Sequence, residues 1–254
     1  MQTRYEKTVT ILPSRVDAQG KLSVPDTFDL FMDTATEAAR ALGVGWDFLI
    51  RRGMFWITVK TKIQFFRRPA LLETVKVETW PEAPGDRRCN RHYRIIGDGG
   101  TLVVGKTDWA IVSVRDGRPQ AMADIMPAGL DYPDEQACPE PFPLIDEAFS
   151  EGPRAEHRVL NTDIDMARHM NNVAYVRAIV NTFPVARWEA MDVREMDIIF
   201  RASAHEGDVL RFQSRRDGSL LDVRGSLPDG STSVLARLRL GGDADGEGSP
   251  CPGT

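Results

Sequence analysis

The sequence predicts an α+β protein made of two tandem copies of one module, in which an antiparallel sheet wraps a long helix. Three observations predict this fold. An amphipathic helical segment precedes a series of strand-like segments, the same order of segments returns in the second half, and residues of the two halves can be aligned. A sheet that curls around the helix buries its apolar stripe, so each copy can form its own core.

In the first copy, a helix is predicted at residues 26–43. Asp26 is its candidate N-cap, and Gly43 marks its C-terminal end. Residues 57–65 alternate between apolar and polar side chains, as in a half-buried strand. The apolar stripe of the helix consists of Phe28, Phe31, Ala35, Ala38 and Leu42. Further strands of an antiparallel meander are predicted at 74–80, 92–96, 102–104 and 109–114.

The second copy repeats this order with shorter segments. A strand at residues 157–161 precedes a helix that ends before Pro184 and carries Val173, Val176, Ile179 and Val180 on one side. Strands follow at 193–200, 209–215, 220–227 and 233–240. The aligned pairs are Asp17 with Asp165, Phe66-Arg67 with Phe200-Arg201, and Asp98-Gly99 with Asp229-Gly230, at offsets of 148, 134 and 131. The falling offset indicates a shorter helix and tighter turns in the second copy.

The boundaries follow from changes in composition. Residues 1–122 form the first predicted module, and the stretch from 123 to 153, rich in proline and acidic residues, is a predicted linker over the surface. Residues 154–241 form the second module, and residues 242–254 a predicted disordered tail.

The composition indicates an ordinary soluble protein. Of 254 residues, 42% are hydrophobic and 27% charged, and no apolar run approaches the roughly 18 residues that span a bilayer. The N-terminus lacks the apolar core of a secretory signal, so we expect a cytoplasmic protein without membrane insertion. The three cysteines are far apart, which predicts neither a disulfide framework nor a metal cluster. A net charge of −5 argues against nucleic-acid binding.

Residues 100–107, GTLVVGKT, match the phosphate-loop pattern GxxxxGK[ST]. A phosphate loop requires a flexible loop that leads into the N-terminus of a helix. Here the intervening residues include Leu102, Val103 and Val104, and a strand-like segment follows. We therefore predict a strand and no nucleotide site.

Two carboxylates, a histidine and two asparagines fall within residues 163–172, DIDMARHMNN, just before the second helix. A turn could bring the carboxylate of Asp165 to the imidazole of His169 and fix its tautomer and charge. The N–H groups at the helix start could face a developing oxyanion, although one of Asn171 and Asn172 is also expected to cap the helix.

The other histidines, His92, His157 and His205, have no comparable neighbours in the sequence. An isolated Asp and His at this spacing is more often a surface pair than a catalytic one. In the first copy, Lys21 and Ser23 align with His169 and Asn171, so that copy is predicted to be catalytically silent.

The segment DMARHMNNVAY resembles the D-x-N-x-H-x-N-N-x-x-Y signature of acyl-acyl carrier protein thioesterases. The likeness covers about 220 residues and includes 76-KVETWPEAPGDRRCNRHYRIIGDGG-100 and 105-GKTDWAIVSV-114. The resemblance implies two hot-dog modules in one chain, forming an internal pseudo-dimer. It also implies hydrolysis of fatty acyl-acyl carrier protein, or of acyl-CoA, to free fatty acid and thiol, without a metal or organic cofactor.

The same resemblance places the family's catalytic residues on Asp165 and His169, with Asn171 beside them. His169 would polarise the thioester or pass protons, and Asp165 would orient it or activate water. Two positions depart from the signature. Ala167 stands where the family has asparagine, and Ser203 stands where the facing strand carries a carboxylate, although a shift of a few residues would substitute Glu206.

An apolar tunnel is expected for the acyl chain, since each buried methylene contributes roughly 0.8 kcal/mol. The predicted substrate-binding residues are Trp46, Met54, Trp56, Asn172 and Tyr175. The aromatic residues among them are equally explained as plain core. The predicted contacts for acidic acyl carrier protein are Arg51, Arg52, Arg67 and Arg68, for which a solvated face is the simpler explanation.

Two other functions remain open for the same fold. One is an acyl-chain-binding protein that does not hydrolyse, which the departures at Ala167 and Ser203 favour. The other is a dehydratase of hydroxyacyl thioesters. The sequence is compatible with a monomer or a homodimer.

Overall fold

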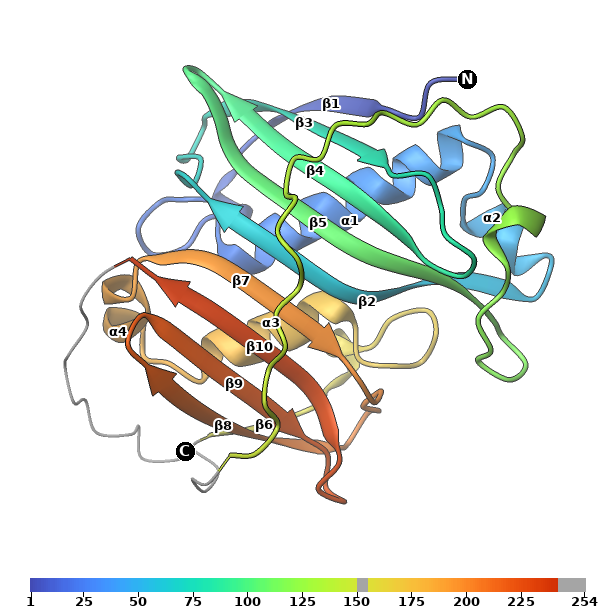
Figure 1. Cartoon of the computed structure of the whole chain (residues 1–254). Coiled ribbons are helices and arrows are strands. Elements are labelled where there is room, and N and C mark those ends of the chain that lie inside the picture. Colours follow the sequence, from blue (N-terminus) through green and yellow to red (C-terminus); the bar gives the residue numbers. More distant parts are fainter. Residues whose placement is uncertain (150–154, 242–254) are drawn as a thin grey trace. The chain divides into compact units, whose positions relative to one another are not determined.

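The computed structural model describes residues 1–149 and 155–241 as an α+β protein with extensive antiparallel sheet and few helices (Figure 1). The predicted fold class is confirmed at this level. The chain divides into two compact units, Met1–Pro141 and Phe142–Thr254. The predicted tail, 242–254, lies outside the described residues.

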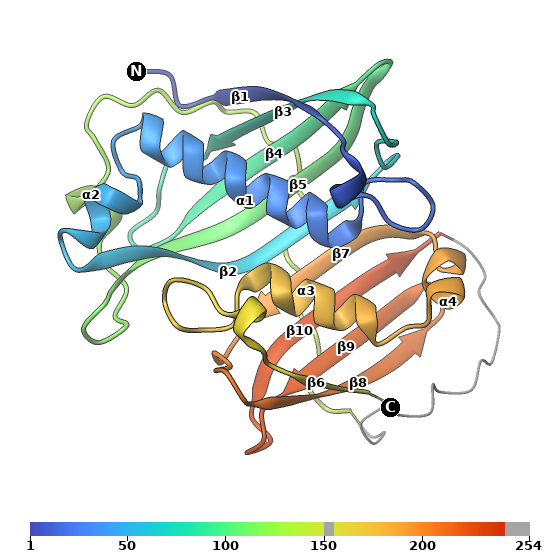
Figure 2. The same cartoon turned by 180° about the vertical axis from the view of Figure 1, so that it is seen from behind.

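In the first unit the sheet has the strand order β1-β3-β4-β5-β2, and every neighbouring pair is antiparallel. Helix α1 lies across one face of this sheet (Figure 2). The core forms between them, where the ring of Phe31 stacks on that of Tyr93 at 4.5 Å. The elements are β1 (Tyr5–Thr10), η1 (Pro13–Arg15), α1 (Val24–Ala41), α2 (Trp46–Ile50), β2 (Met54–Phe65), β3 (Thr74–Pro81), β4 (Cys89–Gly97), β5 (Gly100–Ser113) and η2 (Met122–Asp124).

The strand predicted at residues 100–107 is confirmed, because β5 runs through the whole phosphate-loop-like segment. Its glycine at 105 has a packing reason. A Cβ atom there would meet a ring carbon of Phe31 at 2.4 Å, so only glycine lets α1 approach this strand.

The predicted N-cap of α1 is wrong. Ser23 caps the helix, since its Oγ accepts the N–H of Asp26 at 3.0 Å, and Pro25 occupies the first turn. Asp26 lies three residues inside the helix, where its carboxylate accepts the Ser23 hydroxyl in return. The predicted end is confirmed: Gly43 adopts a φ of 77° just after the last turn.

Several elements differ from the prediction. The two short strands at 102–104 and 109–114 are parts of β5. The edge strand β1 and the short helices α2 and α4 (Val185–Ala190) were not predicted. These helices span only five and six residues, too few to show a period in the sequence.

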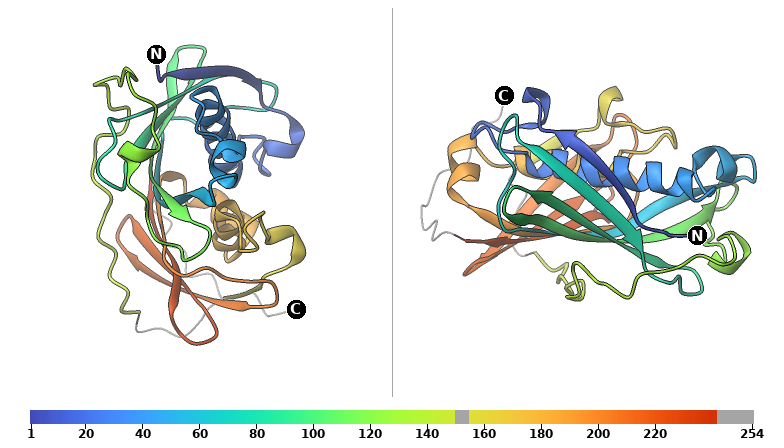
Figure 3. Two further views of the ribbon diagram at one scale, coloured as in Figure 1. Left: turned by 90° about the vertical axis from the view of Figure 1, so that its right-hand side faces the viewer. Right: turned by 90° about the horizontal axis from the view of Figure 1, so that it is seen from above.

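The second unit has the strand order β7-β10-β9-β8-β6, again antiparallel. Its helix α3 lies on one face of the sheet (Figure 3), and the predicted apolar residues Val173, Val176 and Ile179 are buried there. The remaining elements are β6 (Ala155–Arg158), η3 (Asn161–Asp163), α3 (Asn172–Asn181), β7 (Val193–Phe200), β8 (Val209–Asp217), β9 (Leu220–Ser226) and β10 (Thr232–Leu240).

One predicted alignment is off by one residue. Phe65 pairs with Val103 in the first unit, and Phe200 pairs with Val234 in the second, so Phe200 corresponds to Phe65 and not to Phe66. A one-residue shift in a strand exchanges the two faces of the sheet. The corrected offset of 135 decides which side chains correspond in the loops that follow.

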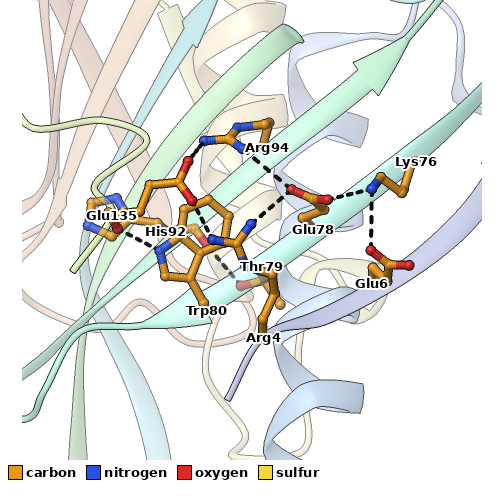
Figure 4. A network of polar contacts seen from close by, with 9 residues as sticks. All are labelled: Arg4, Glu6, Lys76, Glu78, Thr79, Trp80, His92, Arg94 and Glu135. Carbon is orange, nitrogen blue, oxygen red and sulfur yellow. Dashed lines mark hydrogen bonds and ion pairs between the residues drawn. The ribbon is translucent and has the colours of Figure 1, made fainter. Parts of the chain in front are cut away.

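Residues 131–141, which we call the strap, cross the face of the first sheet opposite α1 (Figure 1). The indole of Trp80 donates to the carbonyl of Glu135 at 2.7 Å, and the ammonium of Lys106 donates to that of Glu140 at 2.7 Å. Figure 4 shows that the Glu135 carboxylate also pairs with Arg4 and Arg94. This part of the predicted linker is thus packed on the first unit.

Candidate functional site

The residues between η3 and α3 form a tight turn. Ile164 and Met170 face each other in an antiparallel bridge, and the N–H of Asp165 donates to the carbonyl of His169 at 2.9 Å. Arg168 reverses the chain with a φ of 64°, in the left-handed region, and its N–H donates to the carbonyl of Asp165 at 3.1 Å. The turn therefore holds Asp165 and His169 side by side.

The carboxylate of Asp165 stabilises this turn. Its Oδ1 accepts the N–H of Ala167 at 2.8 Å and the N–H of His169 at 3.4 Å. The expected bond from carboxylate to imidazole is absent among the described residues, so that prediction is wrong: Asp165 binds the backbone of His169 instead. In the described part of the chain Oδ2 accepts no hydrogen bond, which leaves this half-buried carboxylate one oxygen for other contacts.

The imidazole of His169 is half-buried, and its neighbour is another imidazole. The rings of His169 and His205 meet edge to face, with centroids 5.1 Å apart and planes at 81°. The loop that carries His205 is held by the N–H of Met170, which donates to the carbonyl of Ala204 at 2.8 Å. The prediction that His205 has no comparable neighbours is wrong. Its ring meets that of His169, which lies 36 residues earlier in the sequence.

Asn171 caps helix α3. Its side-chain oxygen accepts the N–H of Val173 at 2.8 Å, and its own N–H donates to the carbonyl of Asp163 at 2.7 Å. This confirms the prediction that one of Asn171 and Asn172 is the cap. The side-chain oxygen of Asn171 is already engaged in the helix, whereas its neighbour Asn172 lies half-buried in the first turn.

Tyr175, predicted to bind substrate, supports the loop beside the site. Its buried hydroxyl oxygen accepts the N–H of Ala204 at 2.9 Å and the hydroxyl of Ser233 at 2.9 Å. Burial raises the pKa of this phenol, so it stays neutral. The network fixes the carbonyl of Ala204 that Met170 binds, and hence the position of His205.

Ser203 and Glu206 are both exposed. Within residues 155–241, neither makes a hydrogen bond or an ion pair with Asp165 or His169. The side chain of this loop that contacts His169 is that of His205. The two positions that the sequence predicts, Ser203 and Glu206, lie before and after His205.

Two further histidines have carboxylate partners, contrary to the prediction. Nε2 of His157 lies 2.9 Å from Oδ2 of Asp163, and Nε2 of the fully buried His92 lies 2.7 Å from Oε1 of Glu82. Burial lowers the pKa of His92, so the neutral ring donates to the carboxylate. The first pair is six residues apart on a strand and its adjoining turn, a spacing that could have been noticed.

The predicted pocket residues of the first unit have structural partners there. Met54 and Trp56 pack against a hydrophobic cluster that includes Leu49 and Ile111, and the indole of Trp56 donates to the carbonyl of Val44 at 2.9 Å. Trp46 begins α2 and is 39% exposed. For Met54 and Trp56 these contacts favour the plain-core interpretation.

The four predicted carrier-binding arginines fall into two groups. Arg67 forms two 2.7 Å bonds to the carboxylate of Glu73, and Arg68 pairs with Asp17. Arg51 and Arg52, at the end of α2, are exposed, although Arg51 lies 3.8 Å from the carboxylate of Asp47. Arg51 and Arg52 are therefore the pair better placed to meet a partner.

Residues 1–149 and 155–241 contain no cluster of three or more His, Cys, Asp or Glu side chains suited to a metal ion. Over the same residues, no helix has both the length and the apolar character needed to cross a membrane. The thiols of Cys89 and Cys138 are buried, which raises their pKa values to about 11 and about 12.

Comparison with known families decides what this arrangement belongs to. The model of the acyl-ACP thioesterase N-terminal domain matches residues 2–129, and that of the acyl-ACP thioesterase C-terminal domain matches residues 147–233. The chain belongs to the acyl-ACP thioesterase family. This confirms the resemblance found in the sequence and the predicted class, a thioester hydrolase of fatty acid metabolism.

Named relatives of the acyl-ACP thioesterase family are distant in sequence. Oleoyl-acyl carrier protein thioesterase 1 of Arabidopsis thaliana is 22% identical over 272 residues, covering 94% of this chain and 72% of the relative. Palmitoyl-acyl carrier protein thioesterase of Cuphea hookeriana is 21% identical, covering 85% of this chain. The chain spans 55% of that relative's length.

Solved acyl-ACP thioesterases share the fold. The crystal structure of such an enzyme from Bacteroides thetaiotaomicron superposes with a TM-score of 0.83 at 20% identity, covering 93% of this chain and 97% of the other. The 12:0-ACP thioesterase from Umbellularia californica gives a TM-score of 0.78 at 18% identity, covering 93% and 96%.

Proposed function

We propose that this protein hydrolyses fatty acyl-acyl carrier protein, or acyl-CoA, to a free fatty acid and a thiol. The observation that carries the proposal is the match of both thioesterase domains, with Asp165 and His169 side by side within the second. No metal or organic cofactor is invoked.

The geometry suits a hydrolysis in which water is the nucleophile. Water adds to the thioester carbonyl carbon, and the resulting oxyanion collapses with cleavage of the C–S bond. In our assignment, His169 takes the proton of the attacking water and returns it to the departing sulfur. Asp165 holds the backbone of His169 through Oδ1, and its Oδ2 can orient the water. Donors at the start of α3, near Asn172, would stabilise the oxyanion.

We also propose that each unit is a hot-dog module and that the two form an internal pseudo-dimer, as the family resemblance implies. The repeated hydrogen bonds of the two helix-entry loops support a duplication. Such a pair can satisfy itself as a monomer, although a homodimer remains compatible.

The proposed partner is acyl carrier protein, an acidic protein that Arg51 and Arg52 could contact by charge. The free cysteines agree with a reducing compartment, and we propose the cytoplasm. Trp46 is the predicted acyl-binding residue that keeps substantial exposure, so it is the best of that group for a contact with substrate.

One observation favours a second function, acyl-chain binding without hydrolysis. Ala167 offers no side-chain amide, and within residues 155–241 Ser203 brings no carboxylate toward Asp165. Under this alternative the protein would bind acyl thioesters and release no thiol.

The test is thiol release from a panel of acyl-ACP and acyl-CoA substrates by wild type, Asp165→Asn and His169→Ala. We expect turnover by the wild type and a loss of about 10²–10⁴-fold in kcat for His169→Ala. Asp165→Asn should also lose activity, since its amide cannot replace the free carboxylate oxygen. Binding without thiol release would favour the second function, and full activity in both variants would refute the site.

A further inference from the structure

His205 is placed to act on His169. It is the residue whose ring meets the candidate catalytic imidazole, at 5.1 Å and nearly at right angles. An edge-to-face contact of this kind is favourable for aromatic rings and restricts their rotation. His169 is half-buried, and His205 makes the ring contact that its imidazole has among the described residues.

The position of His205 is fixed from both sides. On one side, the N–H of Met170 and the hydroxyl of Tyr175 hold Ala204. On the other, the N–H of His205 donates to Oδ2 of Asp208 at 2.8 Å, while its Nδ1 lies 3.9 Å from the same oxygen. The ring therefore projects from a loop whose backbone is bound on each side of it.

The first unit builds the same loop without the imidazole. There, the N–H of Leu22 donates to the carbonyl of Pro69 at 2.7 Å, as Met170 donates to Ala204. The N–H of Ala70 donates to a carboxylate oxygen of Glu73 at 2.9 Å.

These bonds identify Ala70 as the counterpart of His205. Lys21 is the counterpart of His169, because its carbonyl accepts the N–H of Asp17 just as that of His169 accepts the N–H of Asp165. The backbone hydrogen bonds of these loops therefore form without an aromatic ring at the positions of His169 and His205. Two imidazoles occur together only in the copy with the proposed site.

We propose that His205 is a positioning residue for His169: its ring holds the His169 imidazole in the orientation that the hydrolysis of an acyl thioester requires. This inference rests on the proposed function. Asp208 contributes by fixing the turn that presents His205. A small misplacement of a reacting group can lower the rate by orders of magnitude, so the effect should appear in kcat more than in KM.

The test compares His205→Ala with His205→Phe. Alanine removes the ring, whereas phenylalanine keeps an aromatic edge and cannot carry a proton. We expect kcat to fall about tenfold in His205→Ala, with KM nearly unchanged, and to recover most of its value in His205→Phe. Melting temperatures of both variants should stay close to that of the wild type, since the side chain is 61% exposed.

A second readout does not depend on turnover. Diethyl pyrocarbonate modifies accessible imidazoles, and peptide mass mapping separates residue 169 from residue 205. We expect His169 to react about threefold faster in His205→Ala than in the wild type or His205→Phe.

Each outcome decides the proposal. An equal kcat in wild type and His205→Ala would overturn it. An equal loss of kcat in the alanine and phenylalanine variants would also overturn it, because that result would indicate proton transfer by His205. If the wild type hydrolysed no thioester, the proposed function would fail. The modification rates would then still decide whether His205 holds His169.

Discussion

The loop before α1 and the loop before α3 use the same backbone hydrogen bonds. In each, an aspartate N–H donates to the carbonyl four residues on, at 2.9 Å in both. The aspartate Oδ1 accepts the N–H groups two and four residues on, at 3.0 and 3.3 Å for Asp17 and at 2.8 and 3.4 Å for Asp165. An Asx-type turn of this sort is a structural device.

Two differences between the loops bear on the aspartate and its neighbour. Asp17 pairs with Arg68, whereas the counterpart of Arg68 at the corrected offset is the exposed Ser203. Lys21 stands where His169 stands. The same aspartate therefore forms a turn in both loops, and the loops differ in whether a guanidinium occupies its second oxygen.

The strongest test of this comparison is to give the second loop the arginine of the first. In Ser203→Arg, the guanidinium should pair with Oδ2 of Asp165 and lower kcat about 100-fold, if that oxygen takes part in catalysis. Ser203→Gln is the matched control for side-chain bulk and should lose much less. Thiol release measures both, and equal activities would separate Asp165 from the reaction.

The next effect concerns stability. Asp17→Ala removes the side-chain oxygen that accepts the N–H groups of Gln19 and Lys21. It also leaves Arg68, whose side chain is 16% exposed, without its carboxylate. We expect a loss of about 2–3 kcal/mol in the free energy of unfolding, against about 1 kcal/mol for Asp165→Ala. Denaturant titration measures both. Equal losses would show that the Arg68 pair adds nothing.

The smallest effect concerns the residue that reverses each turn. Gly20 has a φ of 68° and Arg168 a φ of 64°. Gly20→Ala should destabilise the protein by about 1 kcal/mol, because it forces a side chain into the left-handed region. Arg168→Gly should stabilise the protein by about 0.5 kcal/mol. The substitution relieves the strain of the left-handed backbone, and the larger conformational entropy that glycine loses on folding offsets part of this gain. Thermal unfolding measures both, and a stabilising Gly20→Ala would contradict this reading of the turns.

The long helices and strands could be predicted because each spans enough residues to show its hydrophobic period. Strand β7 agrees with the prediction at both ends, and α3 to within a turn. The correspondence of Asp17 with Asp165 was also visible, because each precedes a helix. The strand register near Phe200 was off by one, since two neighbouring apolar residues in the first unit, Phe65 and Phe66, both fit the pattern.

The contacts of the site were less predictable for a physical reason. Whether the carboxylate of Asp165 turns to an imidazole or to a backbone N–H depends on a local φ of 64° at Arg168, a residue type that seldom adopts it. The approach of His205 to His169 depends on how two loops meet, and that is set by the bonds of Met170 and Tyr175. The spacing of residues along the chain does not predict how these two loops meet.

The strap on the first sheet bears on where this chain can be divided. A fragment that stopped at residue 122, where the strand pattern ends, would remove the carbonyl acceptors of the Trp80 indole and the Lys106 ammonium. It would also remove the carboxylate of Glu135 that pairs with Arg4 and Arg94. Extending it to Pro141 retains both acceptors. Since those acceptors are main-chain oxygens, a substitution in the strap that keeps its backbone path would keep both hydrogen bonds.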